Sequence, residues 1–344
     1  MKVIHLLSTS TFSGAENVVC QIIDLYKTDN INMSYCSVKG PIESNLEDKK
    51  IDFKGLNKFS YFEFKKILKE YKPDVIHAHD IKASILASFF SRKYKIISHI
   101  HGNSEGMKKT SVKSLLYLFA AIKFKHIFWV SKSSLDEYKF KKNILNKSSV
   151  LANIISVDKI IKQSKEKGNQ KSDVIFVGRL VDIKNPLRLI EIFKKVLIKV
   201  PNAKLNIVGS GILENNLKEI INNNELEKNV FLLGFQKNPY KFMKNSKIML
   251  MTSRFEGTPM CALEAMTLGL PIVSTPTDGL VEIVENDKNG YLSSNNDELA
   301  DKIVELISDD ILLKKMSNFA KEKSLSINNK KNYKNELDLY YKNR

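Results

Sequence analysis

The fold of this chain is decided around residues 253–269, which read SRFEGTPMCALEAMTLG. The apolar run just before them, residues 248–251, is typical of a buried parallel strand. Thr258 predicts a helix N-cap, with Pro259 at the first helical position and Gly269 ending the helix. The unpaired backbone N–H groups of such a helix start favour an anion such as a diphosphate. The segment therefore predicts a strand–helix unit with an anion site.

Glu264 carries the only charge between Glu256 and Asp278. A lone carboxylate in an apolar, buried helix is costly unless a partner donates hydrogen bonds to it. No cation lies three or four residues away, so the partner must come from elsewhere in the fold or from a ligand. Two interpretations are open at this point: a structural salt bridge, and a carboxylate that binds sugar hydroxyls beside a phosphate.

Length and composition indicate an ordinary globular protein of two domains. The chain has 344 residues, 43% of them hydrophobic and 27% charged. Lysines interrupt its most apolar helical candidate, residues 115–130, so no membrane span is expected, and residues 3–7 are too short for a signal peptide core. Three widely spaced cysteines predict neither disulfides nor a metal site and favour a reducing cytoplasm.

The net charge of +17 implies attraction to something anionic. A solvated face is the first interpretation of the basic excess, and an anionic membrane surface is the better functional one because no nucleic-acid motif accompanies it. Apolar residues at helical spacing in residues 112–124, with lysines at both ends, allow the same two interpretations. The excess is strongest at Lys108, Lys109, Lys113, Lys123, Lys125, Lys132, Lys139, Lys141, Lys142 and Lys147.

Strand and helix patterns alternate through both halves of the chain, which predicts an α/β fold of two Rossmann-like βαβ domains. We expect a first domain at residues 1–160, a linker at 159–171 and a second domain at 171–327, with a C-terminal helix of about 328–344 packing back on the first. Strands are expected at 2–7, 33–38, 74–78, 95–100, 126–131, 174–178, 205–209, 230–234, 248–251, 271–275 and 291–292. Helices are expected at 15–26, 62–70, 83–90, 112–124, 186–200, 213–222, 259–268, 279–284, 297–308, 311–323 and 333–341.

Several strands end in residues suited to phosphate or sugar chemistry. Gly14 lies in the turn after the first strand, and His101 follows the strand at 95–100, where α/β sheets present their chemistry. Arg179 and Lys184 form a cation pair after the strand at 174–178, well placed for a diphosphate, although pairing with a local acid is equally open. No Asp-x-Asp pair occurs in the sequence, so cations and helix N-termini must neutralise any diphosphate bound here.

The string Gly178-Arg-Leu…Lys184, Gly209-Ser-Gly, Gly234 and then residues 253–273 closely resembles the retaining glycosyltransferases of family 4, the glycosyl transferases group 1. The resemblance covers nearly the whole chain. It is specific in order and spacing over residues 178–290 and looser over residues 1–153. It implies the GT-B fold, in which two Rossmann-like domains face each other across a cleft.

The resemblance assigns roles residue by residue in the second domain. Arg179 and Lys184 would bind the donor diphosphate and stabilise the leaving group. Glu256, the first glutamate of the family's Glu-x7-Glu motif, would contact the transferred sugar, and Glu264, the second, would hold the ribose hydroxyls. The donor-binding positions also include Gly178, Gly209, Gly257, Thr258, Pro259, Met260 and Cys261, with backbone amides available from Met260 and Cys261.

In the first domain the resemblance assigns a phosphate contact to Gly14 and a sugar contact to His101, which would lie over the reacting centre. The family often has two glycines where Ser13 and Gly14 occur here. Residues 152–158 depart from the usual Pro-Asn-Gly-Val-Asp form, and no site residue is carried over from them.

The resulting expectation is a metal-independent retaining transferase without a cofactor. It would move a hexose or N-acetylhexosamine from a UDP-sugar to a hydroxyl of a glycan or polyprenyl-diphosphate-linked acceptor. Surface polysaccharide assembly, such as capsule or lipopolysaccharide, would place it in the cytoplasm, peripherally on the inner face of the cell membrane. The alternatives are a UDP-sugar 2-epimerase or a sugar phosphorylase of the same fold, and a nucleic-acid binding protein, which would leave Glu264 unexplained.

Overall fold

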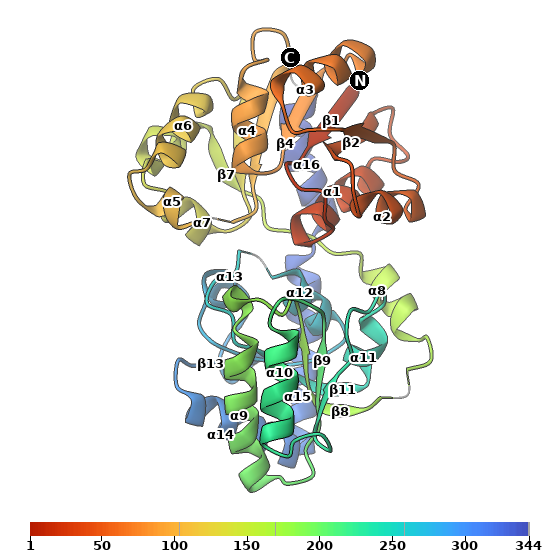
Figure 1. Cartoon of the computed structure of the whole chain (residues 1–344), viewed down its shortest axis with the longest axis vertical. Helices are drawn as coiled ribbons and strands as arrows, with labels where there is room; N and C mark the ends of the chain where they lie inside the picture. The colour runs from red at the N-terminus through yellow and green to blue at the C-terminus, as the bar shows by residue number, and fades with distance from the viewer. Residues whose placement is uncertain (103, 169, 258, 343–344) are drawn as a thin grey trace. The chain divides into compact units, whose positions relative to one another are not determined.

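The computed structural model describes residues 1–102, 104–168, 170–257 and 259–342. The chain divides into two compact units, Met1–Ile154 with Asn329–Arg344, and Ile155–Asn328. Each unit is a parallel β-sheet with helices packed on both faces (Figure 1). Both sheets and their crossover helices have the Rossmann-like arrangement expected from the alternating pattern.

The first unit holds a seven-stranded sheet in the order β3-β2-β1-β4-β5-β6-β7, and its chain order reverses between β1 and β4. Its strands are β1 (Lys2–Leu6), β2 (Asn32–Val38), β3 (Phe53–Leu56), β4 (Val75–Ala78), β5 (Lys95–Ile100), β6 (His126–Trp129) and β7 (Ser148–Val150). Its helices are α1 (Gly14–Leu25), α2 (Ile42–Asp48), α3 (Tyr61–Tyr71), α4 (Ile81–Ser88), α5 (Glu105–Lys108), α6 (Val112–Ala121), α7 (Lys132–Asp136) and α16 (Lys330–Tyr341).

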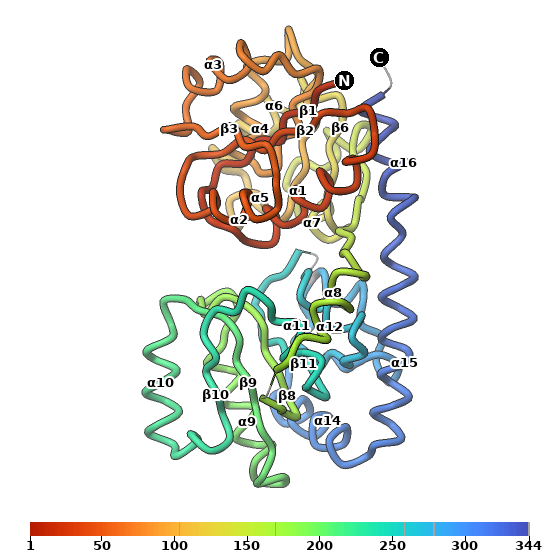
Figure 2. Tube along the Cα trace, turned by 90° about the vertical axis from the view of Figure 1, so that its right-hand side faces the viewer, coloured from red at the N-terminus to blue at the C-terminus, as the bar shows by residue number. Residues whose placement is uncertain are grey.

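The two faces of this sheet differ in chemistry because side chains alternate along each strand. Ile4, Ile76 and Ile96 point to one face and join a core with residues of α3, α4 and α6. The C-terminal helix α16 covers part of the other face, where Tyr340 stacks on the ring of His126 at 3.7 Å between centroids. Figure 2 shows α16 running beside β6.

The second unit holds a six-stranded sheet in the order β10-β9-β8-β11-β12-β13, with the reversal between β8 and β11. Its strands are β8 (Ser172–Val177), β9 (Leu205–Val208), β10 (Val230–Leu232), β11 (Ser246–Met251), β12 (Ile272–Ser274) and β13 (Gly290–Leu292). Its helices are α8 (Val157–Ser164), α9 (Pro186–Lys199), α10 (Glu214–Asn223), α11 (Tyr240–Lys244), α12 (Met260–Thr267), α13 (Asp278–Ile283), α14 (Asn296–Ser308) and α15 (Asp310–Ile327).

Both faces of the second sheet are apolar and buried, as the unbroken apolar strands predict. Val174 and Phe176 of β8 pack with α9, α10 and α14, whereas Ile175 between them packs with α8, α11 and α12. Helix α12 lies in the second of these cores, which explains why its sequence is apolar on nearly every side.

The expected elements recur within one to four residues of their boundaries, with three differences. Residues 159–171, expected as a linker, contain most of α8, whose Ile160 is buried. Helix α12 begins at Met260 with Pro259 as its N-cap, one residue later than expected, while Thr258 lies outside the described residues. Elements too short for a periodic signal, such as β3, β7 and α11, were not expected. Among the described residues, no helix combines the length and apolarity needed to cross a bilayer.

Candidate functional site

The loops that follow β8 and β11 meet at the reversal point of the second sheet. The hydroxyl of Thr252 donates to the carbonyl of Asn185 at 2.9 Å, and the amide of Arg254 donates to the carbonyl of Ile183 at 2.8 Å. Open α/β sheets bind ligands at this kind of position, outside the carboxyl ends of the strands where the order reverses. The strand order therefore joins two loops that lie about 70 residues apart in the sequence.

Lys184 and Glu256 form an ion pair across these two loops. The ammonium nitrogen of Lys184 lies 2.5 and 2.6 Å from the two carboxylate oxygens of Glu256. The hydroxyl of Ser253 donates to the same carboxylate at 2.6 Å. The side chains of Lys184 and Glu256 are 19% and 7% exposed, so the pair is largely shielded from water. Lys184 is thus held by Glu256, and the local acid Asp182 pairs with Arg254 instead.

Arg179 is exposed, and its guanidinium makes no hydrogen bond or ion pair within the described part of the chain. The backbone around it is rigidly held: the amide of Leu180 donates to the carbonyl of Ser210 at 2.9 Å. Gly209 has φ +142°, and a Cβ there would lie 1.9 Å from the carbonyl oxygen of Gly178. The two glycines therefore let the loops after β8 and β9 pack backbone to backbone, with the Arg179 side chain free at the end.

Glu264 projects from α12 and is buried, as its apolar surroundings in the sequence suggested. Its partner is Tyr240 at the start of α11, whose hydroxyl donates to one carboxylate oxygen at 3.0 Å. Burial raises the pKa of Glu264 to about 7, and the Tyr240 hydrogen bond and the charge of Lys159 partly offset that rise. The second carboxylate oxygen has no hydrogen-bond partner among the described residues and is free to accept one from a ligand.

The start of α12 lies between these two carboxylates. Cys261, in its first turn, is close enough to Lys184, Glu256 and Glu264 for their charges to act on its thiol. Burial is the main effect and raises the pKa of the Cys261 thiol to about 12, so this thiol stays protonated and is no nucleophile at neutral pH. Met260 and Cys261, the first two residues of the helix, have backbone amides without a partner inside the helix.

The loop before α12 is held by α13. A Cβ on Gly279 would lie 1.4 Å from the carbonyl oxygen of Gly257, and the amide of Gly279 donates to the carbonyl of Glu256 at 3.2 Å. Gly279 is therefore required for packing under the site. Thr258, an expected donor-binding residue, lies outside the described residues.

The two expected residues of the first unit lie at the carboxyl edge of its own sheet. Gly14 is the first residue of α1, and a Cβ there would meet nothing within 4 Å, so packing inside the unit does not require a glycine. Glu16 holds the loop before it by accepting from the Ser13 amide at 3.0 Å. His101 follows β5, and its Nε2 lies 3.0 Å from Nδ1 of His79.

The first unit contains histidines that lie close enough together to bind a metal ion. Within the described residues, groups of three side chains that could hold a metal ion are found only among His5, His77, His79, His99 and His101. Among the residues that the structure describes, no such group includes Glu256.

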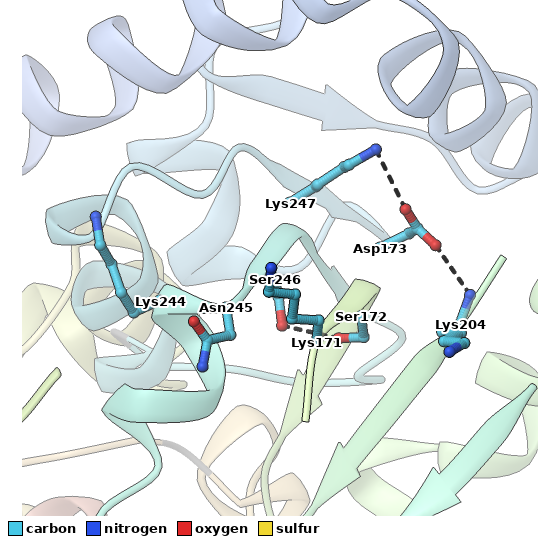
Figure 3. A pocket seen from close by; sticks show the side chains of 8 residues that line it. All are labelled: Lys171, Ser172, Asp173, Lys204, Lys244, Asn245, Ser246 and Lys247. Atoms are coloured by element: carbon cyan, nitrogen blue, oxygen red, sulfur yellow. Dashed lines mark hydrogen bonds and ion pairs between the residues drawn. The ribbon is translucent and has the colours of Figure 1, made fainter. Parts of the chain in front are cut away.

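A hollow of about 390 Å³ lies at the amino ends of β8 and β11, opposite the edge that carries Lys184 and Glu256 (Figure 3). Asp173 in its lining pairs with Lys247 at 3.3 Å and accepts from the backbone amide of Lys204 at 3.0 Å. Because α/β sheets bind ligands at the other end of their strands, we do not assign the candidate site to this hollow.

Two residues of the site were missed by sequence reasoning. Ser253 precedes Glu256 by three residues on the same loop, a spacing that could have suggested the hydrogen bond. Tyr240 lies in the short helix α11, and only the turn-forming pair Asn238-Pro239 before it marked a structured loop. Neither signal identifies Glu264 as the partner of Tyr240.

Comparison with protein families divides the chain between two models. Residues 14–159 match "Glycosyltransferase Family 4", and residues 157–323 match "Glycosyl transferases group 1". An uncharacterized glycosyltransferase of Methanocaldococcus jannaschii is 35% identical over 61% of this chain, which spans only 57% of that protein. The O-antigen biosynthesis glycosyltransferase WbnH of Escherichia coli is 30% identical over 72% of this chain and 71% of its own length.

A further Escherichia coli relative, named UDP-Gal:alpha-D-GlcNAc-diphosphoundecaprenol alpha-1,3-galactosyltransferase, is 28% identical over 86% of this chain and 85% of its own length. The crystal structure of Anabaena HepE in complex with UDP superposes with a TM-score of 0.85, at 20% identity and over 98% of this chain and 99% of that one. That likeness shows the fold, which is GT-B. The family models and the 30% identity to WbnH show the family. The chain belongs to the group 1 glycosyltransferases of family 4.

Proposed function

We propose that this protein is a retaining, metal-independent glycosyltransferase that moves a hexose or N-acetylhexosamine from a UDP-sugar to a hydroxyl acceptor. The observation that carries the proposal is the Lys184–Glu256 ion pair at the start of α12, with the carboxylate of Glu264 four residues into that helix. A cation, free backbone amides and two carboxylates with open acceptor positions match a diphosphate flanked by sugars on both sides.

Donor binding would rearrange the Lys184–Glu256 pair. The diphosphate carries more negative charge than one carboxylate and competes with Glu256 for the Lys184 ammonium. Glu256, released from part of this contact, then accepts hydrogen bonds from hydroxyls of the transferred sugar. The Glu264 oxygen that does not contact Tyr240 accepts from the ribose. Arg179, which has no ion-pair partner in the described part of the chain, neutralises the phosphate from the loop after β8.

These groups would act most strongly as the sugar–phosphate bond breaks. Negative charge then builds on the departing diphosphate, and positioned cations and amides stabilise it without reorganising. The acceptor hydroxyl would attack the face that the nucleotide leaves and give its proton to the departing diphosphate oxygen, so the anomeric configuration is retained. In the first unit we assign the phosphate contact to Gly14 and the sugar contact to His101, on the family resemblance.

The acceptor is proposed from the relatives and from the surface of the first unit. One relative is named for a diphosphoundecaprenol-linked acceptor, and others for capsular polysaccharide and O-antigen biosynthesis. Helix α6 leaves a stripe of large apolar side chains exposed, namely Val112, Leu116, Phe119 and Ile122. With Lys113 and Lys123 at its margins, this stripe (the α6 stripe) fits a peripheral contact with an anionic lipid surface on the cytoplasmic side.

A panel of nucleotide sugars tests the proposal. UDP and UDP-sugars should raise the melting temperature more than other nucleotides, and nucleotide release should require a hydroxyl acceptor. Activity should persist in a chelator. Conversion of the UDP-sugar to its epimer in the absence of an acceptor would indicate an epimerase. A reaction that consumes inorganic phosphate would indicate a phosphorylase. Loss of activity in chelator, restored by a divalent ion, would refute metal independence.

A further inference from the structure

All six histidines of the chain lie in the first unit and on one face of its sheet. Alternation along the strands puts this face opposite the one that packs against α3, α4 and α6. His126 stands apart, since it stacks on Tyr340 and bonds to Ser149. The other five form what we call the histidine cluster: His5, His77, His79, His99 and His101.

The cluster lies at the carboxyl ends of β1, β4 and β5, beside the reversal point of the first sheet, with His79 and His101 just beyond their strands. Nδ1 of His5 lies 2.9 Å from Nε2 of His79, and Nδ1 of His79 lies 3.0 Å from Nε2 of His101. The rings of His99 and His101 stack with 4.4 Å between centroids. Three imidazoles, those of His79, His99 and His101, each have one ring nitrogen within 4.8 Å of the other two.

Three ring nitrogens of this triad lack the hydrogen-bond partner that a buried polar atom normally has within the described residues. Both ring nitrogens of His99 and Nδ1 of His101 are buried, and none of the three has a hydrogen-bond partner among the residues that the structure describes. Leaving such groups unsatisfied costs about 1–3 kcal/mol each. Burial also lowers the pKa of His79, His99 and His101 well below 6.5, so these rings are neutral at pH 7 and keep a lone pair for a ligand.

We propose that His79, His99 and His101 bind one divalent transition-metal ion, such as Zn²⁺, at the carboxyl edge of the first sheet. Three neutral imidazoles without a carboxylate suit Zn²⁺, Co²⁺, Ni²⁺ or Cu²⁺ and disfavour Mg²⁺ and Ca²⁺. Ligand nitrogens on a tetrahedral zinc lie about 3.3 Å apart. The 3.0 Å between His79 and His101 is already close to that spacing, and a ring nitrogen of His99 lies within 4.8 Å of both, so this ring would move toward them to complete the triad.

The positions of the protons agree with this assignment. If Nδ1 of His79 binds the ion, its Nε2 carries the proton and donates to Nδ1 of His5. The proton of His5 is then on Nε2, which faces the sulfur of Met33 at 3.4 Å. His5 thereby holds the ring of His79 in the ligating orientation, as second partners of zinc-bound histidines do. Bound through Nε2, His101 carries its remaining proton on Nδ1.

The alternative triad of His5, His77 and His79 is less suited to a metal ion. Nδ1 of His77 lies 2.6 Å from the hydroxyl of Tyr341, and all three rings are fully buried. In the chosen triad His101 is only partly buried, which leaves a route for an ion to enter. The two proposals share one residue, His101, which is also the proposed sugar contact, whereas the cations and carboxylates of the proposed donor site belong to the second unit.

Titrating the full-length, metal-free protein with Co²⁺ tests the proposal. We expect one ion per chain, a visible absorption band of tetrahedral Co²⁺ that Zn²⁺ abolishes, and a Zn²⁺-dependent rise in melting temperature. His99→Gln should weaken metal binding by roughly 100-fold or more. It removes a direct ligand, and even the loss of a residue that only holds a ligand in place lowers metal affinity by about 10- to 100-fold. His126→Gln is the matched control and should bind the ion as the unchanged protein does.

The absence of stoichiometric Co²⁺ binding, or equal affinity in His99→Gln, would overturn the proposal. If His99→Gln does not fold, His101→Gln replaces it, since that side chain is less buried. Nitrogen NMR of the six histidines gives a second measurement in the unchanged protein. Zn²⁺ should shift the ring nitrogens of His79, His99 and His101 and leave His126 in place; a response at His126, or none, would refute the site.

Discussion

The ammonium of Lys184 and the carboxylate of Glu256, 72 residues apart in the sequence, form a largely buried ion pair with contacts of 2.5 and 2.6 Å. Both groups are also the proposed contacts for a charged donor. The pair therefore keeps two otherwise costly charges compensated until a substrate replaces part of the contact.

Replacing Lys184 by Met should separate the structural and catalytic parts of this pair. Glu256 would keep only the Ser253 hydrogen bond, so we expect a loss of about 3–5 kcal/mol in the free energy of unfolding, measured with urea. The double change Lys184→Met with Glu256→Gln should recover most of that stability and still transfer no sugar. Transfer regained by the folded double variant would show that the pair is structural only.

Arg179→Ala should leave the fold intact and lower the affinity for the nucleotide-sugar donor. The guanidinium has no ion pair or hydrogen bond in the described chain, so stability should stay within about 0.5 kcal/mol. UDP affinity by calorimetry should fall roughly 10- to 100-fold, the effect of a charge-assisted hydrogen bond. Arg254→Ala is the control, because Arg254 forms an exposed pair with Asp182. Equal UDP affinity in both variants would contradict the role of Arg179.

Glu264 should make both stability and UDP binding depend on pH. Burial raises its pKa to about 7 from an ordinary value of 4.5, so the folded state holds a proton that the unfolded state releases between these values. Stability should therefore fall as pH rises from about 4.5 to 7, by on the order of 3 kcal/mol. Glu264→Gln should lack this fall and melt at a higher temperature than the unchanged protein at pH 8.

UDP affinity should rise with pH, whereas stability falls, since the ionised carboxylate of Glu264 is the better acceptor for ribose hydroxyls. Calorimetry at pH 6 and pH 8 should show tighter binding at pH 8 in the unchanged protein and weak binding at both pH values in Glu264→Gln. An identical pH profile for the two proteins would exclude Glu264 as the group responsible.

The α6 stripe should bind anionic vesicles. Phe119 and Ile122 are 64% and 70% exposed, and burying each in lipid contributes about 1.5–3 kcal/mol. Changing both to Ser should reduce co-sedimentation with phosphatidylglycerol vesicles at least 10-fold, and added salt should weaken what remains. Ile198→Ser is the control, as Ile198 is equally exposed on α9 of the second unit. If both variants bind equally, the lysines alone account for the affinity.

The alternation of strands and helices was predictable because each element has its own local signal. Apolar runs such as residues 248–251 indicate buried strands, and Gly269, with φ +84°, ends α12 where the sequence suggested. Short elements escaped prediction because four or five residues carry no period. The helix α8 was missed for a different reason: one face of it is buried by tertiary contacts although its sequence is mostly polar.

The sequence by itself determined the α/β class, the family and the residue types of the proposed donor site, since these depend on local pattern and spacing. Only the tertiary structure decided that Lys184 pairs with Glu256, that Tyr240 donates a hydrogen bond to the buried carboxylate of Glu264, and that five histidines lie together at one edge of a sheet. The order of strands in a parallel sheet differs from their order in the chain. Side chains at strand ends therefore become neighbours through hydrogen-bonded pairing across the sheet, which no local segment encodes.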